Sequence, residues 1–524
     1  MLASAVCAAA VLVTSVLSAA SLPVVAGEQS FSCPSGVSLN DKIAHAHQRY
    51  RASGKVLADR VNKEDGVMLR DEWEKLLQAT NMTLAMTPTD LAALKARQAA
   101  VVEAAKAKAE RESPIKLDAI RGDLAKVKAF CAKMPRASML HVHPSGTRDL
   151  KTVQEFLDEL DPLVNGSRLI EEANDGELTT LYPPEVTALE ALPVQRYSEF
   201  DEAGKKVIQE LFFLPLNPED HPFTRFEALF TIADLLLEQD ESKEQYVEEK
   251  TYIDFAKRAV RLGLSYVEFT KVVIPPNRKA LDRFGELKKL IRKETGGKLI
   301  ANWVFAFVRT IKPTSLNRGW ARQLVNLTTM KGEPSVRGID LLANELDTPA
   351  LETAQGIYVP IKAAREAGKI RLKSTMHSGE LGDFRNVRDA MIMGVERVGH
   401  GVLLREDPVA IEYARDNGVG IVCALVSNKL LRVIDDYATH PCLTFLRLGI
   451  PTSLSTDDEG MFRTDIANEC EVAVLHTDIQ YNEMVALSRN AVLESFAGSR
   501  TKKRLLATLE DELTAFEATF NSTC

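Results

Sequence analysis

The chain has 524 residues, of which 45% are hydrophobic and 26% are charged. This balance is typical of a globular protein with one large domain or two to three smaller ones. The formal net charge is −8, and the absence of a basic block argues against a nucleic-acid partner. The composition leaves a small-molecule ligand open.

The first residues of the chain resemble a leader. Residues 2–27 carry no charged side chain and are rich in Ala, Val, Leu and Ser, and small residues precede Glu28. We expect residues 1–27 to be a secretory signal peptide, so that the mature protein is extracellular and free of the membrane. Because the apolar run is long enough to cross a bilayer, a retained N-terminal anchor is the alternative.

Seven cysteines are scattered along the chain, and no Cys-x-x-Cys pair occurs among them. Their spacing therefore predicts neither a zinc ribbon nor a thiol redox motif. Export would permit disulfides, but the sequence leaves their pairing open.

Residues 28–135 predict a helical N-terminal region without a catalytic motif. An alanine-rich stretch with charges at helical spacing predicts a helix over residues 90–112, capped by Thr89 or Asp90. His45 and His47 stand among polar residues and would not face each other on a helix, so we place both at the surface.

The apolar run over residues 138–142 leads into two histidines, His141 and His143. Side chains two residues apart on a strand point the same way, so both imidazoles lie side by side at the end of this strand. Such a pair offers two nitrogen ligands to one divalent metal. A solvated loop is the alternative for an isolated pair, so the interpretation requires further ligands elsewhere in the chain.

Residues 147–261 predict a long insertion of mixed helix and loop after this first strand. Two of its stretches, residues 211–215 and 223–230, are rich in aromatic and other large apolar side chains. These side chains form either an ordinary helix core or a wall or lid over a pocket, and the two interpretations are compatible.

From residue 260, short apolar runs alternate with amphipathic helical stretches. Strands are predicted over residues 264–269, 299–307, 338–342, 372–376, 397–399, 420–424 and 452–455, and helices over 278–293, 353–367, 387–394 and 408–417. Together with the run that ends at His141, these eight units predict an α/β fold, a (β/α)8 TIM barrel over residues 136–500, followed by a helical tail over 501–524. Active sites of this fold lie at the C-terminal ends of the strands.

Three later predicted strands end in polar side chains. They lead into His377 and Glu380, into His400, and into the pair Asp457 and Asp458. Each signal alone has an ordinary alternative, such as a hydrogen-bonded histidine, a turn or a helix N-cap. Their joint position at one rim of the predicted barrel favours a catalytic site.

A set of three imidazoles and one carboxylate, from His141, His143, His377 and Asp457, suits Zn²⁺ best and leaves room for water. Such a metal would lower the pKa of water from about 15.7 toward about 7. The sequence therefore predicts a metal-dependent hydrolytic site.

The remaining polar residues at this rim suit proton transfer. His400 could take a proton or stabilise charge, and Asp458 could orient the hydroxide. Glu380, three residues after a predicted ligand, could be a protonated carboxyl group that donates to the substrate.

Over residues 136–500, the order of these motifs resembles the adenosine/AMP deaminase family of metal-dependent hydrolases. The motifs that carry the resemblance are Leu140-His141-Val142-His143, residues 336–345, His377-Ser378-Gly379-Glu380, Val398-Gly399-His400-Gly401, Val426-Ser427-Asn428, Ser455-Thr456-Asp457-Asp458 and residues 490–496. The leader, the N-terminal helices and the long insertion are most similar to the secreted branch, the adenosine deaminase growth factor type. That branch implies a homodimer formed through the N-terminal region.

The resemblance implies roles for the candidate residues. His141, His143, His377 and Asp457 would bind zinc, Glu380 would protonate purine N1, and His400 and Asp458 would position and activate the hydroxide that attacks C6. The residue at position 343 would contact purine N3 through its backbone N–H. The implied enzyme is an aminohydrolase acting on C–N bonds of cyclic amidines. It would convert adenosine, and also 2′-deoxyadenosine, to inosine and ammonia in extracellular purine metabolism.

The chain departs from the family pattern at three places. Ala343 stands where the family usually has Gly, Glu459 stands where Pro usually follows the paired aspartates, and Cys423-Ala424-Leu425 replaces the usual Cys-Pro. Two alternatives therefore stay open. One is a related aminohydrolase acting on adenine, AMP or an N6-modified adenine nucleotide, for which Lys429 could meet a phosphate. The other is an inactive signalling or binding protein with the deaminase fold.

Overall fold

The computed structural model describes residues 37–63, 67–79, 85–174, 179–216, 222–239, 241–309, 314–329, 335–346 and 350–523. The predicted signal peptide, residues 1–27, lies outside the described residues. Among the helices of the described ranges, none has the length and apolar character needed to cross a membrane.

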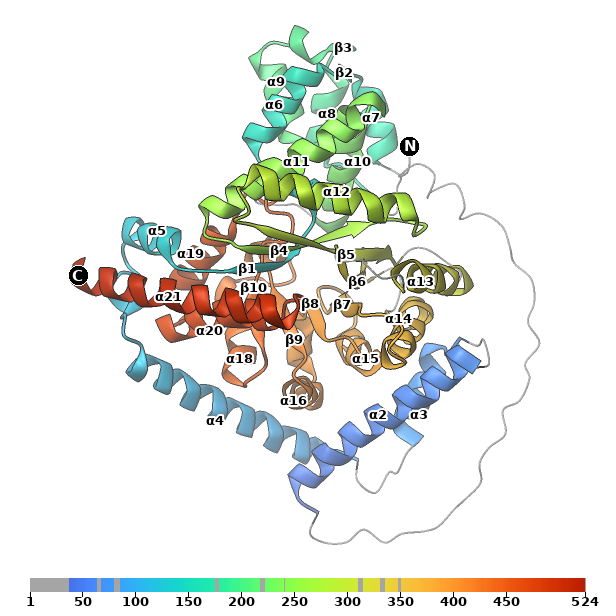
Figure 1. Ribbon diagram of the computed structural model, residues 1–524, viewed down its shortest axis with the longest axis vertical. Coiled ribbons are helices and arrows are strands. Elements are labelled where there is room, and N and C mark those ends of the chain that lie inside the picture. Colours follow the sequence, from blue (N-terminus) through green and yellow to red (C-terminus); the bar gives the residue numbers. More distant parts are fainter. Residues whose placement is uncertain are drawn as a thin grey trace.

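The centre of the molecule is an eight-stranded sheet whose hydrogen-bonded strand pairs are all parallel (Figure 1). Its order is β1 (Ser138–Val142), β4 (Tyr266–Val272), β5 (Ile300–Val308), β6 (Val336–Leu342), β7 (Lys373–Ser378), β8 (Arg397–His400), β9 (Gly420–Cys423) and β10 (Thr452–Leu454). A parallel bridge between Val142 and Asp457 joins the two ends of the sheet. The predicted TIM barrel is confirmed, and each predicted strand lies within a few residues of its place.

Helices cover the outside of this barrel, which explains why its strands are apolar on both faces. They are α12 (Arg278–Glu294), α13 (Thr314–Thr328), α14 (Ala350–Glu366), α15 (Arg385–Met393), α16 (Pro408–Asn417), α17 (Leu425–Leu430), α18 (Cys442–Arg447), α19 (Ile466–His476) and α20 (Tyr481–Leu493), followed by α21 (Ser499–Thr523). The predicted helix over 408–417 is confirmed. Asp407 caps its first turn, Pro408 opens it and Gly418 ends it in the left-handed conformation.

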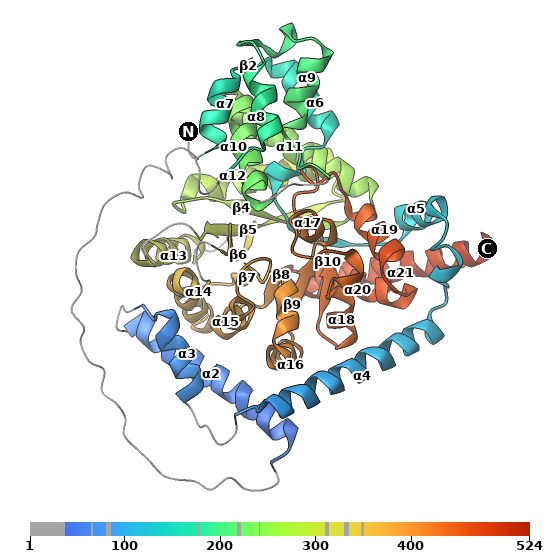
Figure 2. The same cartoon turned by 180° about the vertical axis from the view of Figure 1, so that it is seen from behind.

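In the described part of the chain, four α-helices precede the barrel. The first three lie along the side formed by α14, α15, α16 and α18, and the fourth packs against α19 (Figure 2). They are α2 (Leu39–Lys63), α3 (Arg70–Ala79), α4 (Pro88–Glu112) and α5 (Leu124–Lys133). The predicted cap of α4 is wrong, because Thr87 is the N-cap. Its side chain accepts from the Asp90 N–H, and the carboxylate of Asp90, the third helical residue, accepts from the Thr87 N–H, which forms a capping box. The surface position predicted for His47 is also wrong, since it is buried against the ring of Tyr413.

The segment between β1 and β4 forms a helical body with its own hydrophobic cluster. It contains α6 (Leu150–Leu160), α7 (Gly166–Ala173), α8 (Pro183–Glu190), α9 (Glu202–Glu210), α10 (Pro222–Leu237) and α11 (Glu241–Arg261), with a ribbon of β2 (Leu163–Val164) and β3 (Gln195–Arg196). The ribbon was not predicted because strands of two residues carry no detectable alternation. In Figures 1 and 2 this body lies on the opposite side of the barrel from α2 and α3.

A buried ion pair crosses the interior of the barrel. Arg397, at the start of β8, lies 2.8 Å from the Glu268 carboxylate of β4, and both side chains are at most 1% exposed. The guanidinium also donates to Leu140 O of β1 and lies 4.1 Å from the ring centroid of Phe496. This end of the barrel is therefore closed by a charged pair and an aromatic ring.

Replacing Arg397 tests this interior. Arg397→Met should lower the free energy of unfolding in urea by about 3–5 kcal/mol, because it leaves the Glu268 carboxylate buried and unpaired. Arg405→Met is the matched control, since Arg405 pairs with Glu406 at the surface; its loss should stay within about 1 kcal/mol. Equal losses in the two variants would contradict the importance of the interior pair.

Candidate metal and active site

The four predicted ligands converge at the C-terminal ends of three strands. His141 lies in β1 and His143 directly follows it, His377 lies in β7, and Asp457 follows β10. One ligand atom from each lies within 4.8 Å of all the others. The barrel thus brings together side chains separated by more than three hundred residues in the sequence.

The spacing of these atoms matches a shared cation. The Nε2 atoms of His143 and His377 are 3.2 Å apart, and Asp457 Oδ1 lies 3.1 Å from His143 Nε2 and 3.3 Å from His141 Nε2. Ligands bound at 2.0–2.1 Å to a tetrahedral ion are about 3.3 Å apart. The donor set therefore fits one tetrahedral ion.

Two further side chains orient these ligands. Asp340 Oδ2, on β6, lies 3.0 Å from His377 Nδ1, so Nδ1 carries the proton and Nε2 presents its lone pair. The Ser427 hydroxyl donates to Asp457 Oδ2 at 2.8 Å. We assigned neither role from the sequence, although a single acidic residue within the apolar run of β6 was a usable signal for Asp340.

Glu380 and His400 lie beside this cluster, and their Oε1 and Nδ1 atoms are 3.6 Å apart. Burial, reinforced by the Asp457, Glu345 and Asp458 carboxylates, raises the pKa of Glu380 well above its usual value. Burial and the His141 imidazole lower the pKa of His400 well below its usual value. Burial thus favours the protonated acid at Glu380 and the neutral imidazole at His400.

A chain of hydrogen bonds fixes the tautomer of His400. The Cys442 backbone N–H donates to His440 Nδ1, so His440 Nε2 carries a hydrogen and donates to Asn428 Oδ1 at 3.1 Å. The Asn428 amide therefore donates from Nδ2 to His400 Nδ1, also at 3.1 Å. Neutral His400 must then carry its proton on Nε2, which is buried without a hydrogen-bond partner among the described residues.

Asp458 lies in the same buried loop as Asp457, and burial raises its pKa well above the usual value. Gly146 leaves space for it, because a Cβ at that position would lie 1.7 Å from Asp458 Oδ1. The next residue, Glu459, is buried and pairs with Arg258 of α11 at 2.7 Å. Glu459, which stands where the family usually has Pro, thus links this loop to the insertion between β1 and β4.

The aromatic stretches of the insertion also contact this loop. The ring of Phe226 stacks on Phe462 with centroids 5.0 Å apart, and the Leu214 N–H donates to Met461 O at 2.9 Å. These side chains are buried. They therefore support the loop that follows Asp457 and Asp458, which agrees with both the core and the wall interpretations.

Ala343, the predicted purine contact, follows β6 with a φ of 84°. This is the left-handed region, which an alanine adopts at a cost and a glycine adopts freely. The departure from Gly at this position therefore strains the backbone at the rim of the site.

Comparison with known proteins identifies the family. The sequence pattern described as adenosine deaminase matches residues 224–512, which is more than half of the chain. The chain belongs to the adenosine deaminase family. The matched region contains His377, Glu380, His400, Asp457 and Asp458, and it begins after β1.

Relatives within this family are hydrolases that act on adenine or adenosine. The chain is 27% identical to the adenine deaminase of Mesorhizobium japonicum over 297 residues, 55% of this chain and 86% of that protein. It is 32% identical to the adenosine deaminase of Clostridium botulinum over 152 residues, 29% of this chain and 44% of that protein. The alignment thus spans less than half the length of the second relative.

Solved structures share the fold. An adenine deaminase from Arthrobacter aurescens aligns with a TM-score of 0.53 at 19% identity, over 73% of this chain and 99% of that one. A Burkholderia ambifaria amidohydrolase with bound Zn aligns with a TM-score of 0.55 at 16% identity, over 75% and 94% of the two chains. Arabidopsis ADAL complexed with GMP has a TM-score of 0.52 at 17% identity, over 73% and 98%.

A change at Gly399 tests the metal centre. A Cβ there would lie 2.7 Å from His141 Cε1, so Gly399→Ala should displace this imidazole and weaken metal binding about 10- to 100-fold. Bound metal can be measured after titration with a chelator. Gly285→Ala is the control, because a Cβ at this helical position meets nothing within 4 Å; metal retention by Gly399→Ala at the control level would contradict the assignment.

Ala343→Gly should stabilise the protein by about 0.5–1 kcal/mol. Relief of a left-handed alanine contributes about 1–2 kcal/mol, and the greater freedom of glycine in the unfolded chain removes about 0.4–1 kcal/mol. Urea unfolding measures the change. Ala363→Gly, within α14, should instead destabilise by about 0.5–1 kcal/mol, and a loss of stability at both positions would argue against strain at Ala343.

Proposed function

We propose that this chain is a zinc-dependent deaminase that hydrolyses adenosine, and also 2′-deoxyadenosine, to inosine or 2′-deoxyinosine and ammonia. Membership of the adenosine deaminase family supports hydrolytic deamination of an aminopurine. The observation that carries the proposal is the position of Glu380, a buried carboxyl group whose pKa is raised by burial, beside a buried set of metal ligands.

Zinc fits the donor set better than a hard cation does. Three imidazole nitrogens and one carboxylate oxygen at tetrahedral spacing are typical of Zn²⁺, whereas Mg²⁺ and Ca²⁺ prefer oxygen ligands. The amidohydrolase from Burkholderia ambifaria, which shares the fold, holds Zn. When bound, zinc supplies a Lewis acid that lowers the pKa of water to about 7.

Glu380 acts on the purine ring. Its protonated carboxyl group donates to N1, which draws electrons away from C6 and prepares that carbon for attack by water. As the oxygen of water adds at C6, the ring nitrogen N1 holds the proton from Glu380. Cleavage of the C6–N6 bond then releases the amino group as ammonia, with the proton that the attacking water has given up. The proton of the C6 hydroxyl returns to Glu380 as the C6=O bond forms.

His400 and Asp458 act on the attacking oxygen. With its proton on Nε2, His400 donates a hydrogen bond that stabilises negative charge on this oxygen. Asp458, whose Oδ1 is buried without a partner among the described residues, orients the attacking water by a hydrogen bond. Of the two roles predicted for His400, the tautomer favours charge stabilisation over proton acceptance.

Adenine is the second candidate substrate. The longer of the two sequence alignments, over 297 residues, is with an adenine deaminase. The strained Ala343 also lies where the family places a purine contact. A phosphorylated substrate has less support, because the proposed phosphate contact, Lys429, donates instead to Asp435 O at 2.5 Å.

The extracellular location is a separate part of the proposal. It rests on the sequence of residues 1–27 alone, which predicts a cleaved leader. N-terminal sequencing of the protein from the medium and from the membranes of its source cells would test it. A start at or near residue 28 in the medium supports secretion, and a retained leader in the membrane fraction supports the anchor.

Glu380→Gln tests the proposed chemistry. The amide cannot release a proton to N1, so kcat for adenosine should fall at least about 100-fold. Zinc content should stay at the wild-type level, because Glu380 is not among the four predicted ligands. A Glu380→Gln variant with wild-type kcat would show that the proton donor is another group.

The substrate is decided by formation of the 6-oxopurine product from adenosine, 2′-deoxyadenosine, adenine, AMP and N6-methyl-AMP under the same conditions; the amine released is ammonia from the first four and methylamine from the last. We expect adenosine to give the highest kcat/KM. A higher value for adenine would assign the protein to the second candidate function. A zinc-loaded protein that forms no 6-oxopurine from any of the five would support the inactive binding protein instead.

A further inference from the structure

The N-terminal helix α3 is connected to the loop that carries Glu380. We propose that Arg70 of α3 and Glu345 act as positioning residues for Glu380, linked to each other by Asn386. This inference rests on the proposed role of Glu380 as the proton donor. The inference adds a set of contacts that position Glu380. One member of this set, Arg70, lies outside residues 224–512, which match the family.

Glu345 holds the loop between β7 and α15. Its carboxylate accepts hydrogen bonds from the backbone N–H groups of Gly379 at 3.1 Å and of Glu380 at 2.8 Å. The side chain is only 4% exposed, so water does not compete for these bonds. Since one of the donors is the amide of Glu380 itself, the position of this carboxylate sets the position of the acid.

The loop needs such a restraint. Gly379 and Gly382 flank the acid, with φ values of 72° and 74°. Glycines in this region give the loop conformations that other residues rarely adopt, but they do not select one of them. The hydrogen bonds to the Glu345 carboxylate select one conformation of the loop.

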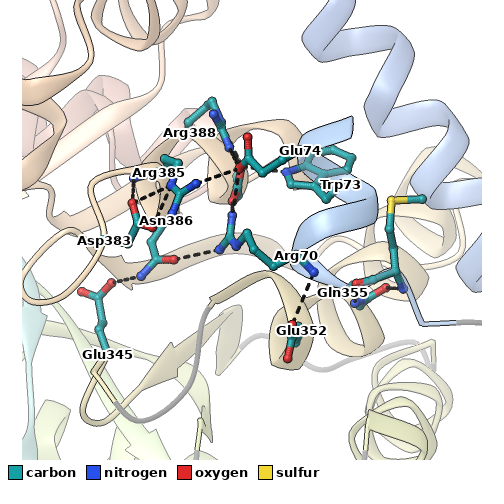
Figure 3. Close-up of polar contacts among 12 residues, drawn as sticks. Arg70, Trp73, Glu74, Glu345, Glu352, Gln355, Asp383, Arg385, Asn386 and Arg388 are labelled. Atoms are coloured by element: carbon teal, nitrogen blue, oxygen red, sulfur yellow. Dashed lines mark hydrogen bonds and ion pairs between the residues drawn. The ribbon is translucent and has the colours of Figure 1, made fainter. Parts of the chain in front are cut away.

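Asn386 connects Glu345 to the N-terminal region (Figure 3). Its Nδ2 donates to Glu345 Oε2 at 3.1 Å, and its Oδ1 accepts from Arg70 at 3.2 Å. The side chain is 1% exposed and lies in the first turn of α15. The amide thus transmits the position of the Arg70 guanidinium to the carboxylate of Glu345.

Arg70 is itself fixed on the barrel. Its guanidinium bonds to the fully buried Asp389, which also accepts from the Trp73 indole at 2.9 Å. The chain just before α3 is held by a reciprocal pair of bonds at 2.9 Å between the backbone of Met68 and the Gln355 amide. Arg70 therefore reaches Asn386 from a rigid support.

The competing explanation is that these contacts only attach α3 to the barrel. Glu74 offers a matched control, because its shortest ion pair is with Arg388 of α15, at 2.7 Å in the same interface. Glu74 also lies 3.5 Å from Arg70, but Glu74→Gln keeps the bonds from Arg70 to Asn386 and Asp389. Glu74→Gln should weaken the attachment of α3 without changing the loop. Arg70→Met should weaken the attachment of α3 and also loosen the loop that carries Glu380.

The experiment compares the zinc-loaded full-length variants Arg70→Met, Glu345→Gln and Glu74→Gln with the wild-type protein. We expect kcat to fall about 10- to 100-fold in Glu345→Gln and about 3- to 10-fold in Arg70→Met, with KM changed less than kcat. Glu74→Gln should keep the wild-type kcat. Arg70→Met combined with Glu345→Gln should lose little beyond Glu345→Gln alone, since both act through one link.

A second measurement does not depend on activity. Hydrogen exchange of the backbone amides of Gly379 and Glu380 should be faster in Arg70→Met than in Glu74→Gln, because these are the amides that Glu345 holds. Arg70 is partly exposed, so Arg70→Met should fold even if Glu345→Gln does not.

The two measurements separate this inference from the proposed function. If Arg70→Met and Glu74→Gln show the same kcat and the same exchange, the link does not position Glu380 and the inference is overturned. If exchange is faster in Arg70→Met but Glu380→Gln keeps full activity, the link positions the loop and the role of Glu380 as proton donor fails.

Discussion

The closure of the barrel is the constraint on which the site depends. His141 lies on the first strand and Asp457 follows the last, so they can share a cation only if these strands meet. The bridge between Val142 and Asp457, together with a bond from the His141 backbone N–H to the Ser455 hydroxyl at 3.0 Å, makes that contact. Once the sheet is closed, ligands at the ends of β1, β7 and β10 face one point on its axis.

Much of the fold could be predicted because parallel strands covered by helices have a simple signature. The strands are short apolar runs, and the candidate ligands stand where these runs end. The residues that orient the ligands could not be predicted in this way. Asn428, His440 and Glu345 act through partners on other elements, and only the packed structure shows which polar residues meet.

The errors have a similar cause. The surface position of His47 was inferred from its polar neighbours in sequence, yet α2 turns this side chain against α16. The cap of α4 was placed too late because Asp90 has the right chemistry for an N-cap but serves as the partner of Thr87. In both cases a local pattern allowed two positions, and a contact outside that pattern selected one.

The family pattern begins at residue 224, whereas the barrel begins at β1 with Ser138. A recombinant fragment cut to the boundaries of that pattern would therefore lack His141 and His143. It would also leave β4 and β10 with unpaired backbone groups along two open edges, a state that favours intermolecular strand pairing and aggregation. The domain that folds is thus longer than the segment by which its relatives are recognised.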